Sequence, residues 1–395
     1  MKQTIILTLL FMCLFVRGFS QGGELSPLSK LSLLTVGTGT DLAAKFGHSG
    51  IRLQDPALGV DVVYGYGTYN FEDPNFYLNF VRGKLDYTIS RYPFDLFKKS
   101  YVIEQRWVRE QPLNLDLEQR KAVVSFLETN LLPQNRLYKY DFLFENCATK
   151  IPEVFEKNLG NALEFNFSHL GEQRTFRQLI HQNLNVNSWS NFGIDLALGS
   201  VIDREATPYE HMFLPIYVYQ QLKHTTVNGQ PLAGEETVVL DLPTPQDHTP
   251  FLLSPAFWLG LLSLLTLWVT YRDGQRASRS RALDVFLFAF TGLAGAIIVF
   301  LWFFTDHDAT KGNLNLLWAL ATHLIVAFYV AREPLPKWLF PYLALALLLL
   351  AITVILWLLA VQVFSPLIIF VLLALAVRYG YLIWYLRRPP LPQSA

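Results

Sequence analysis

The sequence has little charge and little cysteine for its length. Of 395 residues, 16% are charged, 52% are hydrophobic and only two are cysteine. An ordinary soluble domain carries about a quarter charged residues, so the composition argues against a purely soluble protein. Lys plus Arg equals Asp plus Glu at 32 each, which gives a formal net charge of zero. Without a global field of one sign, nothing in the charge balance would gather a polyanion, and we expect no nucleic-acid partner.

The apolar excess lies in the last third of the chain. Only 15 of the 64 charged residues fall among the 145 residues after Pro250. Most apolar segments in this region approach the ~20 residues needed to cross ~30 Å of hydrocarbon. The segments cover residues 253–271, 283–304, 316–330, 339–361 and 366–386. We therefore predict an all-α transmembrane domain of five helices over residues 251–388, followed by a cytoplasmic tail at 389–395.

Charge around these segments predicts the orientation of the chain. The loop between the first and second apolar segments contains four arginines. The loop between the second and third segments has two acidic residues, Asp306 and Asp308, and one lysine, Lys311. Arg-rich loops stay in the cytoplasm, which places the region before Pro250 on the exported side. Residues 1–20 have the layout of a signal peptide, with a basic Lys2, an apolar run and small residues near the end. An uncleaved membrane anchor is the alternative for this segment.

The exported region reads as an α+β domain over residues 21–225. Strand patterns occur in LSLLTVGTGT, FGHSGIRL and VDVVYGYGTY, and the turn-rich QDPALG between the last two predicts a hairpin. A helical pattern follows in DLEQRKAVVSFLETNLLP, where Asp116 and Gln119 match a capping box and Pro133 ends the helix. Residues 226–250 are rich in turn residues and proline, which predicts a linker with a possible short hairpin.

Cys147 is the one cysteine that a cleaved chain would keep, and it lies in the motif FENCATK. A thiol at the start of a helix has a lowered pKa because the exposed N–H groups favour the thiolate. Asn146 is a plausible N-cap for such a helix. Pro152 argues against this reading, because a proline six positions into a helix kinks or ends it. Cys147 is therefore either a nucleophile or a small buried hydrophobe.

His48 is the candidate partner of this thiol. Nucleophilic cysteine chemistry needs an imidazole that accepts the proton and returns it, and His48 lies on an expected strand between two glycines. A structural histidine is the alternative. Tyr64 and Tyr66 are two residues apart on the next strand and share a face. Either tyrosine would orient the His48 ring if the hairpin register placed that face beside it.

A polar loop, TDHDATKGNLN, falls at the exported end of two expected spans. Its side chains His307, Asn313 and Asn315 are candidate substrate contacts, and a simple polar connection is the alternative. The sequence contains no metal-ligand spacing and no phosphate-binding glycine loop. It therefore predicts neither a metal site nor another cofactor.

The order of a strand-borne His followed by Asn-Cys at a helix start resembles circularly permuted papain-like enzymes, including the lecithin-retinol-acyltransferase-like proteins. A closer resemblance covers nearly the whole chain. The segments FGHSGIRLQD, VVYGYGTYNFEDPNFYLNFVRGKLDY, YKYDFLFENCATKI and TDHDATKGNLNLLW look like the bacterial lipoprotein N-acyltransferase family of the Bacteroides type. Proteins similar to these carry an exported domain ahead of several membrane helices.

This resemblance implies an acyltransferase of the bacterial inner membrane. Cys147, activated by His48, would take an acyl chain from a phospholipid as a thioester. The α-amine of a diacylglyceryl-cysteine lipoprotein would then accept the chain, so that both partners and the membrane meet at one site. Two alternatives stay open: a membrane-tethered NlpC/P60-like cysteine peptidase or amidase acting on the cell wall, and a non-catalytic membrane scaffold.

Overall fold

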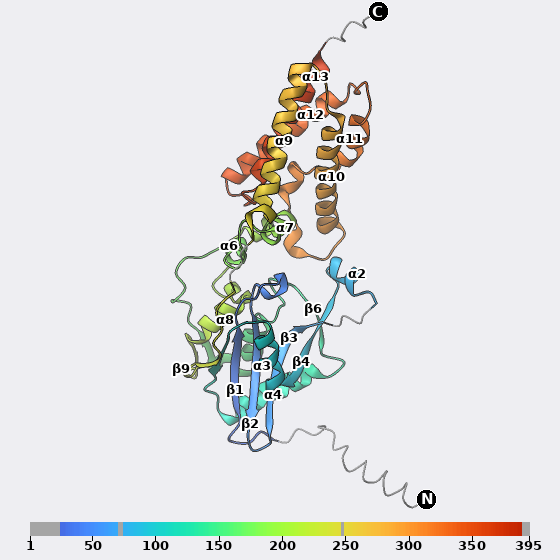
Figure 1. The fold of residues 1–395 in the computed structure, drawn as a ribbon. Coiled ribbons are helices and arrows are strands. Elements are labelled where there is room, and N and C mark those ends of the chain that lie inside the picture. Colours follow the sequence, from blue (N-terminus) through green and yellow to red (C-terminus); the bar gives the residue numbers. More distant parts are fainter. Residues whose placement is uncertain (1–23, 70–73, 246–248, 389–395) are drawn as a thin grey trace, which may run out of the picture.

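The structure is a computed structural model that describes residues 24–69, 74–245 and 249–388. The expected signal peptide (1–20) and cytoplasmic tail (389–395) lie outside the described residues. Figure 1 shows a sheet-containing domain at one end of the molecule and a bundle of long helices at the other, with helices α6 (Phe176–His181) and α7 (Trp189–Ala197) between them. The expected division into an N-terminal domain of strands and helices and a helical C-terminal domain is confirmed.

The N-terminal domain is built on a seven-stranded sheet in which every neighbouring pair is antiparallel. The strand order is β10-β5-β1-β2-β3-β4-β6. The strands are β1 (Lys30–Val36), β2 (His48–Asp55), β3 (Val60–Thr68), β4 (Asp86–Pro93), β5 (Val108–Pro112), β6 (Leu137–Lys139) and β10 (Thr237–Leu240). The expected hairpin is present, because β2 pairs directly with β3.

Helices cover both faces of this sheet. On one face, α4 (Leu117–Leu131) and α5 (Lys150–Leu159) pack on alternate residues of the central strands, including Leu33 and Ile51. On the other face, α3 (Phe94–Ile103) packs on the intervening residues. Alternation of side chains along a strand produces this division. The capping box of α4 is confirmed by reciprocal bonds between Asp116 and Gln119.

The rest of the domain consists of short elements. A three-stranded sheet contains β7 (Leu163–Phe165), β8 (Thr225–Val227) and β9 (Gln230–Pro231). The remaining helices are α2 (Phe76–Val81), α8 (Pro215–Leu222) and the 3-10 turns η1 (Leu42–Ala44), η2 (Gly160–Ala162), η3 (Ser200–Ile202), η4 (Glu210–Phe213) and η5 (Phe251–Leu253). Residues 226–250, expected as a linker, thus include part of the β8–β9 hairpin and the edge strand β10 of the main sheet.

Five α-helices follow in the described part of the C-terminal region, but not all are built to cross a bilayer. They are α9 (Pro255–Arg276), α10 (Arg281–Phe303), α11 (His323–Val330), α12 (Leu339–Leu358) and α13 (Ile368–Arg387). Among the described residues, only α10, α12 and α13 are both long and apolar enough to be candidate spans. Three of the five expected spans are therefore supported by length and composition. Eight residues of α11 extend about 12 Å, whereas the hydrocarbon layer is about 30 Å thick.

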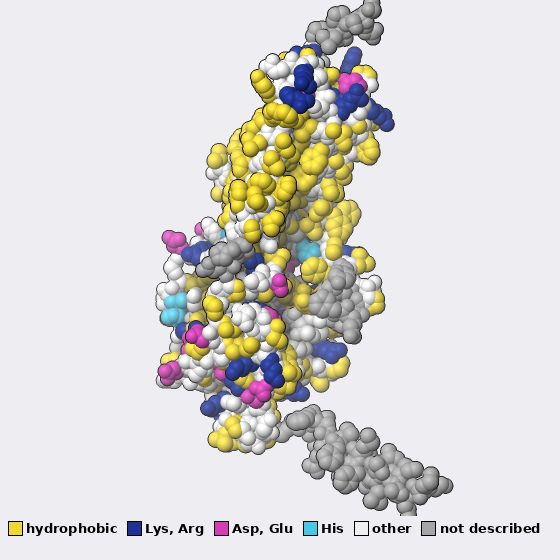
Figure 2. Space-filling view, viewed as in Figure 1, with side chains coloured by type: hydrophobic (Ala, Val, Ile, Leu, Met, Phe, Trp, Pro, Cys, Tyr) yellow, Lys and Arg dark blue, Asp and Glu magenta, His cyan; other side chains and the backbone are white. Residues whose placement is uncertain are grey.

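Apolar side chains dominate the surface of this helical region, as Figure 2 shows, and Lys and Arg gather at its end farthest from the sheet. The opposite end meets the N-terminal domain through the loop between α10 and α11. That loop contains two 3-10 turns, η6 (Asp308–Thr310) and η7 (Leu314–Leu317). Its contacts with the N-terminal domain determine how the sheet is held against the membrane helices.

Candidate active site

Cys147 lies in a tight turn directly before α5, and Asn146 fixes this turn. The Asn146 Oδ1 accepts hydrogen bonds from the N–H groups of Ala148 (2.7 Å) and Thr149 (3.0 Å). Its Nδ2 donates to the carbonyls of Phe142 (2.6 Å) and Phe213 (2.9 Å). Asn146 therefore caps the turn that carries the thiol, while α5 itself begins three residues later than Cys147.

The late start of α5 also resolves the difficulty with Pro152. This proline is the third residue of the helix, where its missing N–H would have no intrahelical partner. A proline in the first turn does not break a helix. The sequence reading counted the turn at Cys147 as helix and so placed Pro152 too deep.

Cys147 is half-buried, and strand β2 contacts its sulfur. Burial raises the pKa of the thiol. Hydrogen bonds from the backbone N–H groups of Ser49, Cys147 and Ala148, and the positive charge of Arg106, act in the opposite direction. Burial dominates, so the thiol is protonated in the resting protein. The Ser49 contact places the sulfur next to the residue that follows His48.

His48 is the first residue of β2 and pairs with Val36 of β1. Burial and the charge of Arg106 lower its pKa to about 4. The imidazole is therefore neutral at physiological pH and free to accept a proton. Its Nε2 lies 3.6 Å from the position that a Cβ would occupy at Gly65, which shows how closely the ring approaches strand β3. Similarly, a Cβ at Gly67 would lie 3.7 Å from the Cβ of Cys147.

The structure contradicts the orienting role expected for Tyr64 and Tyr66. In the β2–β3 hairpin, Ile51 is opposite Tyr64, so the two tyrosines share the face of Ile51 and point away from the His48 face. The Tyr64 hydroxyl donates to Glu128 Oε1 on α4 (2.6 Å). The Tyr66 hydroxyl accepts from a side-chain amide on the same helix, that of Asn130 (3.1 Å). Both are structural links between the sheet and α4.

Tyr92 of β4 lies on the His48 face instead. Its hydroxyl oxygen is 2.8 Å from the Cβ position of Gly65, which also borders His48 Nε2. Burial, together with the charge of Cys147, raises the pKa of Tyr92 to about 12. The same two causes raise the pKa values of Tyr138 and Tyr140. These phenols stay protonated and therefore add no negative charge near the thiol.

Arg106 supplies a positive charge to this site, and no sequence motif points to it. It follows α3 and is only 4% exposed. Its Nε donates to the carbonyl of Gly37 (2.8 Å), and its Nη1 donates to Glu104 Oε2 (2.7 Å). Its Nη2 is buried without a hydrogen-bond partner among the described residues. A buried, unsatisfied donor of this kind costs about 1–3 kcal/mol, and its charge acts on both Cys147 and His48.

The loop expected to bind substrate is part of the interface between the two domains. The buried Asn313 donates from Nδ2 to the carbonyls of Leu196 (2.8 Å) and Ala197 (3.0 Å) at the end of α7. Asn315 Nδ2 donates to the carbonyl of Asp195 (3.0 Å). These amides are engaged in holding the domains together, so the expectation that Asn313 and Asn315 contact substrate is corrected.

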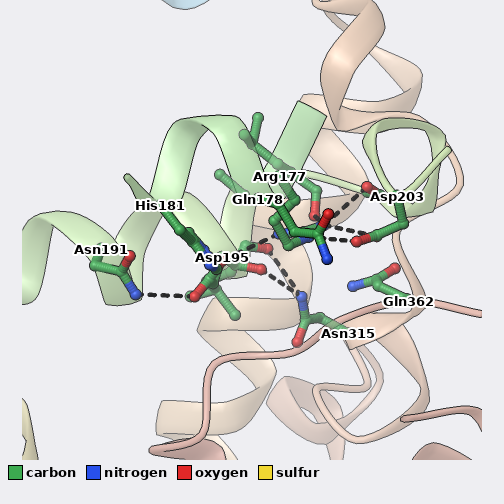
Figure 3. A network of polar contacts seen from close by, with 12 residues as sticks. Arg177, Gln178, His181, Asn191, Asp195, Asp203, Asn315 and Gln362 are labelled. Atoms are coloured by element: carbon green, nitrogen blue, oxygen red, sulfur yellow. Dashed lines mark hydrogen bonds and ion pairs between the residues drawn. The ribbon is translucent and has the colours of Figure 1, made fainter. Parts of the chain in front are cut away.

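An ion-pair network extends this interface into the N-terminal domain (Figure 3). The Asp195 carboxylate contacts Arg177 (3.1 Å), His181 (2.8 Å) and Asn191 (3.0 Å). Arg177 also donates from Nε to Asp203 (2.8 Å). Buried charges of this kind are costly unless they are paired and hydrogen-bonded. The pairing here fixes α6 and α7 relative to each other and, through the backbone at Asp195, to the membrane domain.

His307 lies at another contact between the domains. Its Nδ1 is 3.0 Å from Thr305 Oγ1, and its ring Cδ2 lies 3.2 Å from the Cβ position of Gly83. Burial lowers the pKa of His307, while the charges of Asp141 and Asp306 act to raise it. His307 thus faces the N-terminal domain.

The comparisons with known proteins cover most of the chain. A family model described as the Lnb N-terminal periplasmic domain matches residues 25–182, and one described as the Lnb transmembrane domain matches residues 246–389. No significant match was found among curated proteins or solved structures. The two family models occur here in the order of the two structural domains. The chain therefore belongs to the Bacteroides-type lipoprotein N-acyltransferase (Lnb) family, with a periplasmic domain followed by a membrane domain.

Proposed function

We propose that this protein transfers an acyl chain from a phospholipid, through a thioester on Cys147, to the α-amine of a diacylglyceryl-cysteine lipoprotein. The observation that supports this proposal most strongly is the environment of the Cys147 thiol. The thiol is hydrogen-bonded by the N–H of Ser49, next to a neutral His48, in a domain that packs against membrane helices. Circularly permuted papain-like enzymes, which the order of His48 and Cys147 resembles, use such a pair for acyl transfer.

The first step forms the thioester. His48 takes the thiol proton as the sulfur attacks the ester carbonyl of the phospholipid, because the imidazole is neutral and the thiol is protonated at rest. The ester C–O bond then breaks, and His48 returns the proton to the departing lysophospholipid hydroxyl. The N–H groups near Cys147 and the unpaired Nη2 of Arg106 stabilise the negative charge that develops on the carbonyl oxygen.

The second step forms the amide. The lipoprotein amine attacks the thioester carbonyl, and His48 accepts the amine proton. The C–S bond breaks, and the proton moves from His48 to the Cys147 sulfur. An amide is less reactive than a thioester, so the transfer runs in one direction.

The membrane domain explains how both lipid substrates meet the thiol. The acyl donor and the diacylated acceptor are confined to a bilayer, and a domain docked on spanning helices is held at that surface. The Lys and Arg side chains at the far end of the helical region (Figure 2) support a cytoplasmic location for that end and for the C-terminus.

Mass spectrometry of lipoprotein N-termini from cells tests the proposal. Cells that carry Cys147→Ala or His48→Ala should accumulate diacylated lipoproteins with free α-amines, while the membrane abundance of the protein stays near normal. Tyr66→Phe is the matched control, since the Tyr66 hydroxyl is engaged by Asn130 on α4, and it should leave N-acylation intact. Full N-acylation with abundant Cys147→Ala protein would favour the scaffold, and altered peptidoglycan without a lipoprotein defect would favour the peptidase.

A further inference from the structure

Helix α2 lies at the edge of the periplasmic domain that adjoins the membrane helices (Figure 1), and it exposes apolar side chains to solvent. Leu78, Phe80 and Val81 are 56%, 54% and 46% exposed. Leu78 and Val81 are three residues apart and share a face of the helix, and Phe80 lies beside Val81. Exposed apolar side chains gathered in this way mark an interaction surface. We call Leu78, Phe80 and Val81 the α2 patch.

The α2 patch is fixed at the level where a spanning helix leaves the bilayer. The N–H of Asp306 donates to the carbonyl of Arg82 (2.9 Å), immediately after α2. Asp306 follows α10 by only three residues, and α10 is a candidate span. Gly83 has a φ of 67° and allows the close approach of the backbone at His307.

Apolar and cationic neighbours identify what covers this patch. Phe303 and Phe304, at the end of α10, are also exposed, so the α2 patch continues the lipid-facing surface of the helical region. Two cations, Arg82 and Lys84, border it on the side of the sheet, and the Lys84 Nζ is 3.8 Å from Asp306. Apolar residues beside Lys and Arg are the composition of segments that lie in the headgroup region of a bilayer.

We propose that α2 is an interfacial membrane anchor, which inserts Leu78, Phe80 and Val81 into the adjoining leaflet and presents Arg82 and Lys84 to lipid phosphates. Insertion of α2 into the bilayer does not depend on the proposed function; only its role in delivering phospholipid to Cys147 does. Helix α2 connects β3 and β4, whose Gly67 and Tyr92 border the active site. A leaflet held at α2 would therefore bring phospholipid ester groups to the thiol.

Lipid quenching of a fluorescent label tests the insertion directly. The full chain, with Cys13→Ser and Cys147→Ser, would carry bimane on Leu78→Cys or Val81→Cys in phosphatidylcholine nanodiscs. Leu58→Cys is the matched control, because Leu58 is as exposed as Val81, at 46%, but lies in the β2–β3 turn at the opposite end of the sheet from His48. The test needs no acyl transfer, so it stands even if the proposed chemistry fails.

We expect brominated acyl chains to quench the label at positions 78 and 81 and not at position 58. Because interfacial segments insert about 5–10 Å, bromines near the glycerol should quench more than bromines near the chain ends. Equal quenching at all three positions, or none, would overturn the proposal. Quenching only when the label density per nanodisc rises would point to a second copy and would overturn it too.

A functional measurement separates lipid contact from folding. In the chain with native Cys147, Leu78→Glu combined with Val81→Glu should slow thioester formation from a bilayer phospholipid. Thioester formation from a water-soluble, short-chain aryl ester should keep its rate, since that donor needs no leaflet. Equal losses with both donors would contradict a lipid-binding role for α2.

Discussion

Replacing Asn315 by alanine tests whether the loop between α10 and α11 is a domain interface or a substrate site. In the structure, the buried Asn315 donates to the carbonyls of Asp195 (3.0 Å) and Leu196 (3.3 Å). Its Oδ1 accepts from Trp318 Nε1 (2.9 Å). Its Nδ2 also donates to Asn313 Oδ1 (3.0 Å). Asn315→Ala removes all four bonds and leaves the partner groups buried.

The expected loss follows from these bonds. Each intramolecular hydrogen bond contributes about 1 kcal/mol net, and a buried polar group left unsatisfied costs about 1–3 kcal/mol. The two bonds to the α7 carbonyls of Asp195 and Leu196 predict a loss of about 2 kcal/mol in the free energy that holds the domains together. At about 1.4 kcal/mol per factor of ten, the docked state should lose about thirtyfold in relative population.

Hydrogen exchange at the amides of α7, with thermal inactivation in nanodiscs, measures this loss. The matched control is Lys311→Ala in the same loop, because Lys311 is exposed and pairs with Asp308, three residues away in the same loop. We expect faster exchange in α7 for Asn315→Ala and native exchange for Lys311→Ala. A raised KM for either lipid substrate, with native exchange and native thermal stability, would refute the interface role.

Three further predictions concern residues of β2 and β3. Tyr64→Phe loses the hydrogen bond to Glu128 and should lower the free energy of unfolding by about 1 kcal/mol. It should leave the rate of thioester formation unchanged, which stopped-flow kinetics with a labelled phospholipid would measure. Gly65→Ala should slow thioester formation, because the added methyl group would lie 2.8 Å from the Tyr92 hydroxyl oxygen. Adding Tyr92→Phe removes that oxygen and should restore much of the rate. If the rate is not restored, a clash with the Tyr92 hydroxyl is not the cause. Because the His48 pKa is about 4, kcat/KM should fall only as the pH drops well below 6.5, and an acid limb at the ordinary histidine pKa would contradict the buried neutral base.

The role of Arg106 gives a related pH test. Its positive charge lowers the His48 pKa, so Arg106→Gln should raise that pKa and move the acid limb of kcat/KM to higher pH. Arg106→Lys keeps the charge and should leave the limb close to its native position. If the acid limb of kcat/KM lies at the same pH for Arg106→Gln and for the native protein, the charge of Arg106 does not influence His48.

The elements that the sequence predicted correctly are those with strong local signals. The β2–β3 hairpin has a turn-rich connection between two strand patterns, and α4 has a capping box at Asp116 and a proline shortly after its last residue. The pair of Cys147 and His48 stays a prediction, and it rests on a nucleophile and an imidazole that each stand in a local motif. In each case, a few neighbouring residues carry the information.

The incorrect site predictions concern residues whose position depends on strand register or on tertiary packing. Tyr64 and Tyr66 share a face, but only the register, with Ile51 opposite Tyr64, shows that this face points away from His48. Arg106 lies in a loop without a motif, and the fold alone brings its charge to Cys147.

In the membrane domain, composition did not predict the short length of α11. The segment around α11 is as apolar as its neighbours, yet only eight of its residues are helical. The turn η7 before it packs against the membrane core instead, with Leu314 and Leu316 among the contacts. The polar residues Asn313 and Asn315 looked like a substrate site because an exposed loop and a buried polar interface have the same composition.

Mass spectrometry of the protein itself tests the thioester most directly. Purified protein in nanodiscs would be incubated with a phospholipid that carries deuterated acyl chains, digested, and examined at the peptide that contains Cys147. The account predicts a deuterated acyl group on that peptide, labile to hydroxylamine, which disappears when a diacylated lipopeptide is added and reappears on the lipopeptide α-amine. Transfer of the deuterated chain to the lipopeptide by Cys147→Ala protein at the native rate would contradict it.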